Sequence, residues 1–193
     1  MAPRLLIVGA GGFGRAVAEA AAASAGFEIV GFADDRSPAL EEREGIRILG
    51  RATNLESLKP LADFAVVAIG DNALRANFAR KAVQQGFALA TVIHPRAFVS
   101  PSARVGAGTM IMAGSVIGSS SVLGQGVIVH YGSAIDHDCA IGSFSHIGVG
   151  ACISGGVVLG ERVWLQAGCT LGRAVQIGDG IVVSESQRQH PSI

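Results

Sequence analysis

The fold of this chain is decided by residues 93 to 177, which read in groups of six as IHPRAF VSPSAR VGAGTM IMAGSV IGSSSV LGQGVI VHYGSA IDHDCA IGSFSH IGVGAC ISGGVV LGERVW LQAGCT LGRAVQ I. Each group begins with Ile, Val or Leu, and this aliphatic position recurs fifteen times without a gap. A small or medium side chain, such as Ser115 or Cys139, stands four residues later. The period of six fits neither a helix, with about 3.6 residues per turn, nor a lone strand, with a period of about two.

A strict repeat of this length is the signature of a β-solenoid. Three short strands make one triangular coil of about 18 residues, and the aliphatic residues stack inward at the ~4.8 Å spacing of paired strands. Cys139 and Cys169 fall at inward positions, where they act as small core residues. We therefore predict a parallel β-helix over residues 93–183, followed by an irregular tail over residues 184–193.

Charge is scarce in this repeat although the whole chain is balanced, with 15 Lys and Arg against 15 Asp and Glu. Between residues 93 and 182 there are eight charged residues, where average composition would give roughly 22. Such neutral outer faces indicate burial against another chain, so we expect a homotrimer. The neutral net charge gives no indication of a nucleic-acid or anionic-membrane partner.

The chain carries no obvious targeting signal. It has no apolar run of the length, ~18 residues or more, that spans a membrane, and its start does not have the layout of a signal peptide. Three cysteines, an odd number, fit a reducing compartment better than a disulfide framework. We therefore expect a cytoplasmic protein without a membrane span.

The first 92 residues alternate between strand and helix patterns, which predicts a Rossmann-like α/β half-domain with a parallel sheet. Thr53 and Asn72 are the residue types that cap helices, and we expect each to cap one here. The expected strands cover residues 5–8, 27–33, 45–49, 64–69 and 87–92, and the expected helices cover residues 13–23, 55–58 and 72–85.

A glycine-rich loop follows the first expected strand. Residues 9–14 read GAGGFG and satisfy G-x-G-x-x-G, which lets a phosphate approach a helix N-terminus. Asp34 follows about 20 residues later, where a ribose-binding acid is expected. The motif indicates a nucleotide-containing ligand, although a half-sized domain of about 90 residues is too small for a complete dinucleotide fold.

Taken together, these features resemble one group of hexapeptide-repeat acyltransferases. The glycine loop, the tripeptide IHP at residues 93–95 and the tetrapeptide DHDC at residues 136–139 are similar to those of the sialic-acid O-acetyltransferase and UDP-4-amino-sugar N-acetyltransferase family. The resemblance implies a left-handed β-helix, acetyl-CoA as co-substrate, a nucleotide-linked amino sugar as acceptor (or a sugar hydroxyl), and no metal.

The resemblance also implies the catalytic residues. His137 would be the general base and Asp138 the acid that orients it. Neighbouring side chains of an ideal strand point to opposite faces, so either flanking aspartate can touch His137 only near a corner. Gly155 lies one coil beyond His137, and its N–H is our candidate donor to the oxyanion.

Further residues are assigned to the two substrates by the same resemblance. For acetyl-CoA they are His146, which we expect to act from a neighbouring subunit, and Ala167. For the nucleotide sugar they are Gly11, Gly12, Phe13, Asp34, Asp35, Asn72 and His130. Many members of the family have His at the position of Phe13.

Two alternatives from other functional classes remain open on sequence alone. One is a zinc-dependent, carbonic-anhydrase-like solenoid, whose characteristic H-x4-H pair this chain lacks. The other is a non-enzymatic nucleotide- or NAD-binding module on a trimerising solenoid, which the glycine loop permits. Acetyl transfer by the protein would exclude the second alternative.

Overall fold

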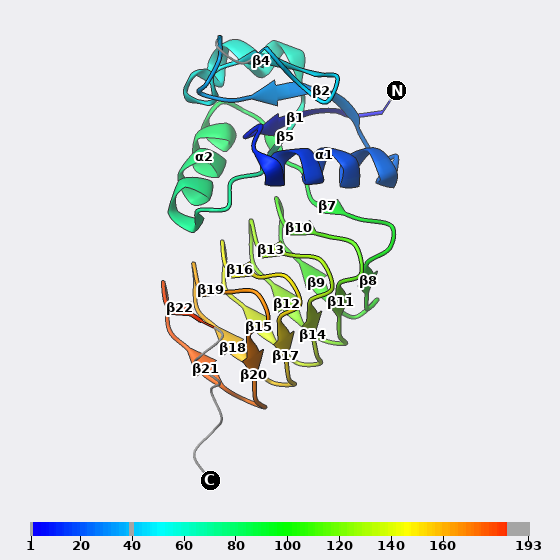
Figure 1. Cartoon of the computed structure of the whole chain (residues 1–193), viewed down its shortest axis with the longest axis vertical. Coiled ribbons are helices and arrows are strands. Elements are labelled where there is room, and N and C mark those ends of the chain that lie inside the picture. Colours follow the sequence, from blue (N-terminus) through cyan, green and yellow to red (C-terminus); the bar gives the residue numbers. More distant parts are fainter. Residues whose placement is uncertain (1, 39–40, 185–193) are drawn as a thin grey trace. The chain divides into compact units, whose positions relative to one another are not determined.

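The computed structural model describes residues 2–38 and 41–184, and it divides into two compact units, Met1–Val92 and Ile93–Ile193 (Figure 1). The first unit is a sheet with helices, and the second is a stack of short strands. Most of the predicted tail, from residue 185 onward, lies outside the described residues.

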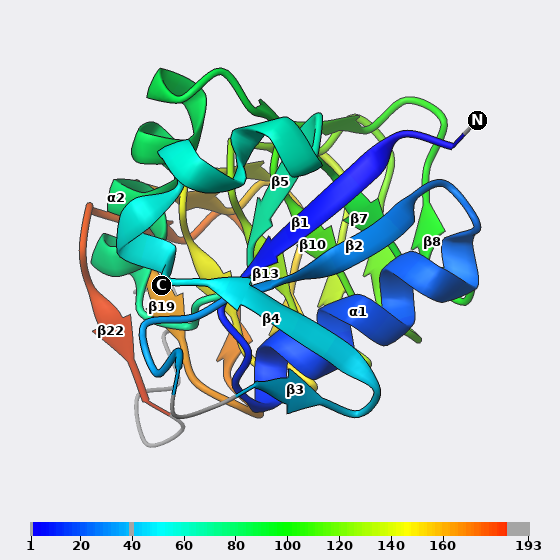
Figure 2. The same cartoon turned by 90° about the horizontal axis from the view of Figure 1, so that it is seen from above.

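The first unit contains a six-stranded sheet in the order β3-β4-β2-β1-β5-β6 (Figure 2). All neighbouring strands are parallel except β3 and β4, which pair antiparallel. The strands are β1 (Arg4–Val8), β2 (Glu28–Ala33), β3 (Glu42–Arg43), β4 (Ile46–Gly50), β5 (Phe64–Val67) and β6 (Ala88–Leu89). The helices are α1 (Gly12–Ser24) and α2 (Asn72–Gln84), with two 3₁₀ helices over Ala52–Asn54 and Glu56–Leu61.

The predicted Rossmann-like half-domain is therefore present, with β1 at its centre. Leu5 to Val8 of this strand are fully buried, as expected for a central parallel strand covered on both faces. Gly9 and Gly14 make the turn from β1 into α1 tight. A Cβ on Gly9 would lie 2.9 Å from the Ala68 carbonyl oxygen, and one on Gly14 would overlap the carbonyl of Gly9.

Three details of the prediction for this unit were wrong. The cap of α2 is Asp71, whose carboxylate accepts a hydrogen bond from the Leu74 N–H at 2.8 Å; Asn72 is the first residue of the helix. Thr53 caps no helix through its side chain, because its hydroxyl donates to Asp35 instead. The strand expected over residues 87–92 is divided, and its second part, β7 (Val92–Ile93), pairs with the solenoid.

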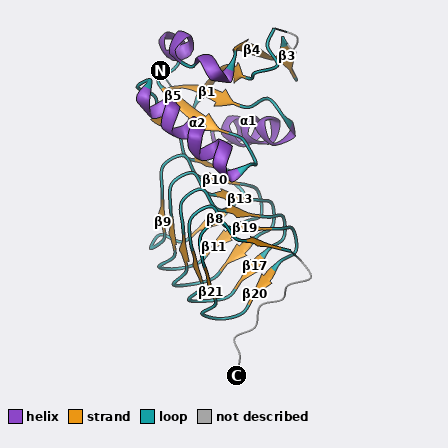
Figure 3. Ribbon diagram, turned by 90° about the vertical axis from the view of Figure 1, so that its left-hand side faces the viewer, coloured by secondary structure: helices purple, strands orange, loops and turns teal. Residues whose placement is uncertain are grey.

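The second unit consists of two-residue strands arranged in three parallel sheets, joined by turns (Figure 3). The first sheet contains β7, β10 (Met110–Ile111), β13 (Ile128–Val129), β16 (His146–Ile147), β19 (Trp164–Leu165) and β22 (Val182–Val183). The second contains β8 (Phe98–Val99), β11 (Val116–Ile117), β14 (Ala134–Ile135), β17 (Cys152–Ile153) and β20 (Thr170–Leu171). The third contains β9 (Arg104–Val105), β12 (Val122–Leu123), β15 (Ala140–Ile141), β18 (Val158–Leu159) and β21 (Gln176–Ile177).

The hexad series forms the core of this solenoid, as predicted. Each strand pairs with the strand one coil later, for example Ile111 with Val129 and Val129 with Ile147. The aliphatic residues from Ile111 to Ile177 are buried, whereas the first three of the series are partly buried. Cys139 and Cys169 are buried with them. The inward stacking follows from apolar burial in register, since each strand is too short to bury a surface alone.

From residue 108 onward, the turns of the solenoid have a left-handed residue at their second position. Glycine fills most of these positions, among them Gly114, Gly132 and Gly156. Asp138 is one of the exceptions, with φ of 58°. Aspartate tolerates this conformation better than most residues, but glycine would adopt it without strain, so a side chain here has to be explained by what it contacts.

In the described part of the chain, no helix has both the length and the hydropathy needed to cross a membrane.

Candidate active site

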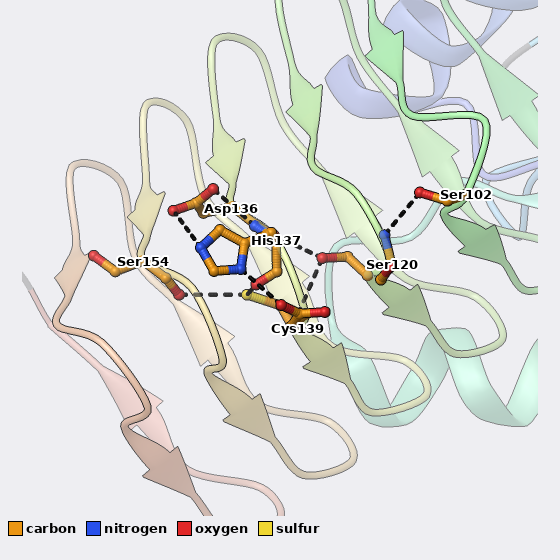
Figure 4. Close-up of polar contacts among 8 residues, drawn as sticks. Ser102, Ser120, Asp136, His137, Cys139 and Ser154 are labelled. Atoms are coloured by element: carbon orange, nitrogen blue, oxygen red, sulfur yellow. Dashed lines mark hydrogen bonds and ion pairs between the residues drawn. The ribbon is translucent and has the colours of Figure 1, made fainter.

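His137 lies at a corner of the solenoid, between β14 and β15 (Figure 4). Because Asp138 is in the left-handed conformation, its side chain turns back toward the histidine, and Oδ2 lies 2.8 Å from His137 Nδ1. On the other side, Asp136 accepts a hydrogen bond from the His137 backbone N–H at 2.8 Å, and its Oδ2 lies 3.9 Å from Nε2. The corner thus brings both flanking carboxylates to the ring, an arrangement that a straight strand would forbid.

The electrostatic effect of this arrangement is to favour the protonated ring. The hydrogen bond to Asp138 is the largest cause, and together with the charge of Asp136 it raises the pKa of His137 above its ordinary value. Arg173 acts in the opposite direction. The bond to Asp138 also makes Nδ1 the donor, which leaves Nε2 as the basic nitrogen of the neutral ring.

Gly155 lies against this ring, one coil beyond it. A Cβ built on Gly155 would stand 2.7 Å from both Cε1 and Nε2 of His137, which is closer than real Cβ atoms come to other heavy atoms. The neighbouring Gly156 N–H donates to the His137 carbonyl at 3.0 Å. Within the described residues, the Gly155 N–H itself has no hydrogen-bond acceptor.

A separate groove of about 460 Å³ lies on the first sheet of the solenoid, and it contains three of the predicted site residues. The groove is lined by His130, His146, Gly148, Val149, Trp164, Gln166 and Ala167. The His146 ring stacks between those of His130 and Trp164, with centroids 5.0 and 5.3 Å away. His146 thus lies in β16 on the first sheet, whereas His137 lies in the turn between β14 and β15.

The glycine loop borders a cavity of about 450 Å³ in the first unit. Five of the predicted residues line it: Gly11, Gly12, Phe13, Asp34 and Asp35. A Cβ on Gly11 would stand in open space and one on Gly12 would meet only the Arg15 guanidinium at 3.9 Å, unlike Gly9 and Gly14, where a Cβ would clash. No side chain caps the N-terminus of α1 and no acidic residue occupies its first turn, so this end of the helix can accept an anion.

The two aspartates of the cavity differ in how far they are already engaged. Asp34 accepts hydrogen bonds from the Ala10 N–H at 2.8 Å and from the Arg36 guanidinium through both carboxylate oxygens. The hydrogen bond from Arg36 is the main reason that the pKa of Asp34 lies well below the ordinary range. Asp35 receives the N–H and hydroxyl of Thr53 on Oδ1. In the described structure its Oδ2 accepts no hydrogen bond.

Asn72 does not line this cavity, although the turn before it does. Its Oδ1 accepts from Arg75 at 2.7 Å. Arg75 is a buried side chain of α2 that also donates to the carbonyls of Ile69 and Gly70, and burial lowers its pKa to about 10. Asn72 thus lies behind the binding surface, in contact with the residue that holds the surface in place.

Several site residues were not predicted from the sequence. Trp164 stands 18 residues after His146, so the solenoid period was a signal that could have found it. Arg36, Leu74 and Phe78 line the cavity of the first unit, but only the path of the chain brings them there. Among residues 2–38 and 41–184, no three His, Cys, Asp or Glu side chains are grouped so that they could hold a metal ion.

Both units of the chain are similar to units of known proteins. Residues 4–82 match the family model of the PglD N-terminal domain. PerB from Caulobacter crescentus, solved in complex with CoA and GDP-perosamine, is 35% identical over 93% of this chain and 85% of PerB, with a TM-score of 0.88. The acetyltransferase domain of PglB from Neisseria gonorrhoeae, solved in complex with acetyl coenzyme A, is 36% identical over 95% of this chain and 97% of that domain, with a TM-score of 0.79.

WeeI from Acinetobacter baumannii is similar at 20% identity, with a TM-score of 0.75 over 93% of this chain and 90% of WeeI, and supports the fold alone.

These similarities define an acyltransferase built on a left-handed parallel β-helix, in agreement with the predicted fold class. The chain belongs to the hexapeptide-repeat sugar acetyltransferase family that includes PerB and the PglB domain. This family assignment replaces the two alternative hypotheses, the non-enzymatic module and the carbonic-anhydrase-like solenoid.

Proposed function

We propose that this protein is an acetyl-CoA-dependent N-acetyltransferase that acts on a nucleotide-linked 4-amino sugar, with His137 as the general base. The observation that carries the proposal is the corner at which the His137 ring lies between two carboxylates and against Gly155. The similarity to PerB, a perosamine N-acetyltransferase solved with CoA and GDP-perosamine, supports the choice of both substrates.

The acceptor first loses one proton to solvent and becomes a neutral amine, and the corner residues then carry the second proton from nitrogen to sulfur. As the amine nitrogen attacks the thioester carbonyl carbon, His137 Nε2 takes its proton, and Asp138 steadies the imidazolium through Nδ1–H. We assign to the Gly155 N–H the stabilisation of the tetrahedral oxyanion. Collapse of the intermediate breaks the carbon–sulfur bond, and the imidazolium returns its proton to the departing CoA thiolate.

Asp136 favours an amine over a hydroxyl as the acceptor. An amino sugar exists in solution largely as an ammonium ion, and the Asp136 carboxylate, 3.9 Å from His137 Nε2, would attract this cation to the corner before it loses its first proton to solvent. An amino group bound beside this pair could donate a hydrogen bond to the Asp136 carboxylate and to the neutral His137 ring. A hydroxyl acceptor would gain nothing comparable from this second carboxylate.

The test of the function is a panel of UDP-, GDP- and dTDP-linked 4-amino sugars incubated with acetyl-CoA, with free thiol as the readout. We expect thiol release with at least one amino sugar and none with its 4-hydroxy counterpart. Equal release with both sugars, or none with any amino sugar, would refute the proposed acceptor.

The nucleotide of the acceptor would bind at the glycine loop, with its diphosphate at the N-terminus of α1 and with Asp35 Oδ2 accepting from the base or ribose. Gly12→Ala should raise the KM for the sugar about tenfold or more, because the new methyl group occupies space that the structure leaves open to ligand. The KM for acetyl-CoA should stay unchanged. Gly26→Ala, at another uncrowded glycine of the same unit, is the control, and an equal effect there would argue against a binding role for Gly12.

Acetyl-CoA would bind in the groove that contains His146, Trp164 and Ala167, facing the His137 corner of a neighbouring copy. Exposed apolar side chains on the outer faces of the solenoid, among them Phe98 and Val116, support such an assembly. We therefore expect light scattering to give three times the chain mass of 19.6 kDa. A monomer with full activity would contradict the shared site.

The pH dependence of the rate should reveal the coupling between His137 and Asp138. Because the raised pKa of His137 keeps the ring protonated to higher pH, activity should be lost as pH falls through that pKa. Asp138→Asn keeps a residue that tolerates the left-handed turn but removes the charge, so the acid limb should move to lower pH while kcat falls. Steady-state rates across pH provide the measurement, and Glu161→Gln, at another corner, is the control. If the acid limb does not move in Asp138→Asn, Asp138 does not set the pKa of the group that controls the rate.

A further inference from the structure

We infer that Ser121 is a positioning residue for the catalytic corner. This side chain is buried at an inward position, one coil before Cys139. Its hydroxyl donates to the Asp136 carbonyl at 2.6 Å and accepts from the Cys139 N–H at 3.1 Å. Those two peptide groups lie immediately before and after the two turn residues, so one hydroxyl holds both ends of the corner. The inference rests on the proposed role of His137.

The corner needs this support because its second residue, Asp138, has a strained backbone conformation. The backbone of Asp138 is left-handed, with φ of 58°, and its carboxylate reaches the ring only in that conformation. A strained residue of this kind keeps its conformation only when its surroundings fix it. Ser121 supplies the fixed points from the core side, where the exposed side chains of the corner cannot.

The same device occurs elsewhere in the solenoid without any catalytic group. Thr109, at the equivalent inward position of an earlier hexad, donates to the Gly124 carbonyl at 3.0 Å and accepts from the Val127 N–H at 3.2 Å. Its corner, residues 125–126, carries none of the proposed catalytic residues. Ser145 makes the same two contacts, with the Gly160 carbonyl at 2.9 Å and the Val163 N–H at 3.0 Å. Of the three buried hydroxyls in matching contacts, Thr109, Ser121 and Ser145, only Ser121 brackets His137.

The test compares kcat of Ser121→Ala with that of Thr109→Val, which removes the other hydroxyl and retains the volume. We expect both variants to lose a similar amount of thermal stability. Only Ser121→Ala should lower kcat, by about ten- to a hundredfold, with KM values little changed, because misplacing the ring affects the transition state. Ser121→Thr should restore kcat, since Thr109 makes the same two bonds at the equivalent position.

Ser121→Cys serves if the alanine variant does not fold, because Cys139 and Cys169 occupy equivalent inward positions and a thiol is a poorer hydrogen-bond partner. It too should lower kcat. Wild-type kcat in folded Ser121→Ala or Ser121→Cys, or an equal loss in Thr109→Val, would overturn the inference. If His137→Ala is severely impaired while Ser121→Ala and Ser121→Cys are fully active, only the positioning role fails. If His137→Ala itself is fully active, the proposed base fails first.

Discussion

Replacing His137 by alanine should lower kcat by about 10²- to 10⁴-fold while leaving both KM values nearly unchanged. The variant loses the nitrogen that takes the proton from the attacking amine, and this loss is felt in the transition state rather than in substrate binding. The ring is half exposed, so its removal leaves no cavity in the core and the protein should remain folded. Steady-state kinetics with acetyl-CoA and the best amino sugar of the panel provide the measurement.

Asparagine is the matched control at this position. His137→Asn keeps a polar side chain that can still bond to Asp138 but cannot accept a proton at neutral pH, so it should be as slow as the alanine variant. A folded His137→Ala trimer with more than about a tenth of wild-type turnover, against the expected loss, would place the base elsewhere.

The second large effect is expected at Gly155, where alanine should reduce kcat about a hundredfold. The added methyl group would stand 2.7 Å from His137 Nε2, so the ring must move away from its catalytic position. The backbone of Gly155 lies outside the left-handed region, which means that alanine introduces no strain of its own. The loss should therefore come from displacement of the ring.

Gly178→Ala distinguishes this effect from a general intolerance of side chains in the solenoid. Gly178 has open space around it and no left-handed backbone, so its alanine variant should keep wild-type kcat. If Gly155→Ala is fully active, the ring does not need the position seen here. If both variants are equally slow, the effect is not specific to the catalytic corner.

The fold could be predicted from the sequence because one strict rule governs each unit. A hexad series without a gap can be buried only by stacking coil on coil, and the GAGGFG loop after an apolar strand leads directly to a helix. The helix caps were less predictable. Asp71 and Asn72 are both favourable capping residues, and the choice between them depends on Arg75, which engages the Asn72 side chain.

The sequence analysis named residues of the candidate site, but it did not predict how they are arranged in space. Simple strand alternation separates His137 from its flanking acids, and only the left-handed turn at Asp138 brings all three together. The ion pair of Asp34 with Arg36 depends likewise on a local turn of the backbone. The stack of His146 on Trp164 follows from the 18-residue register, the same register that relates Gly155 to His137.

The central claim is that the protein transfers an acetyl group from acetyl-CoA to the amine of a nucleotide-linked sugar. The most direct measurement is mass spectrometry and NMR of the product formed from acetyl-CoA and the preferred amino sugar. We predict one acetyl group, on the amine nitrogen, and one free CoA thiol for each product molecule. An acetyl group on a sugar hydroxyl, or thiol release without an acetylated sugar, would contradict this account.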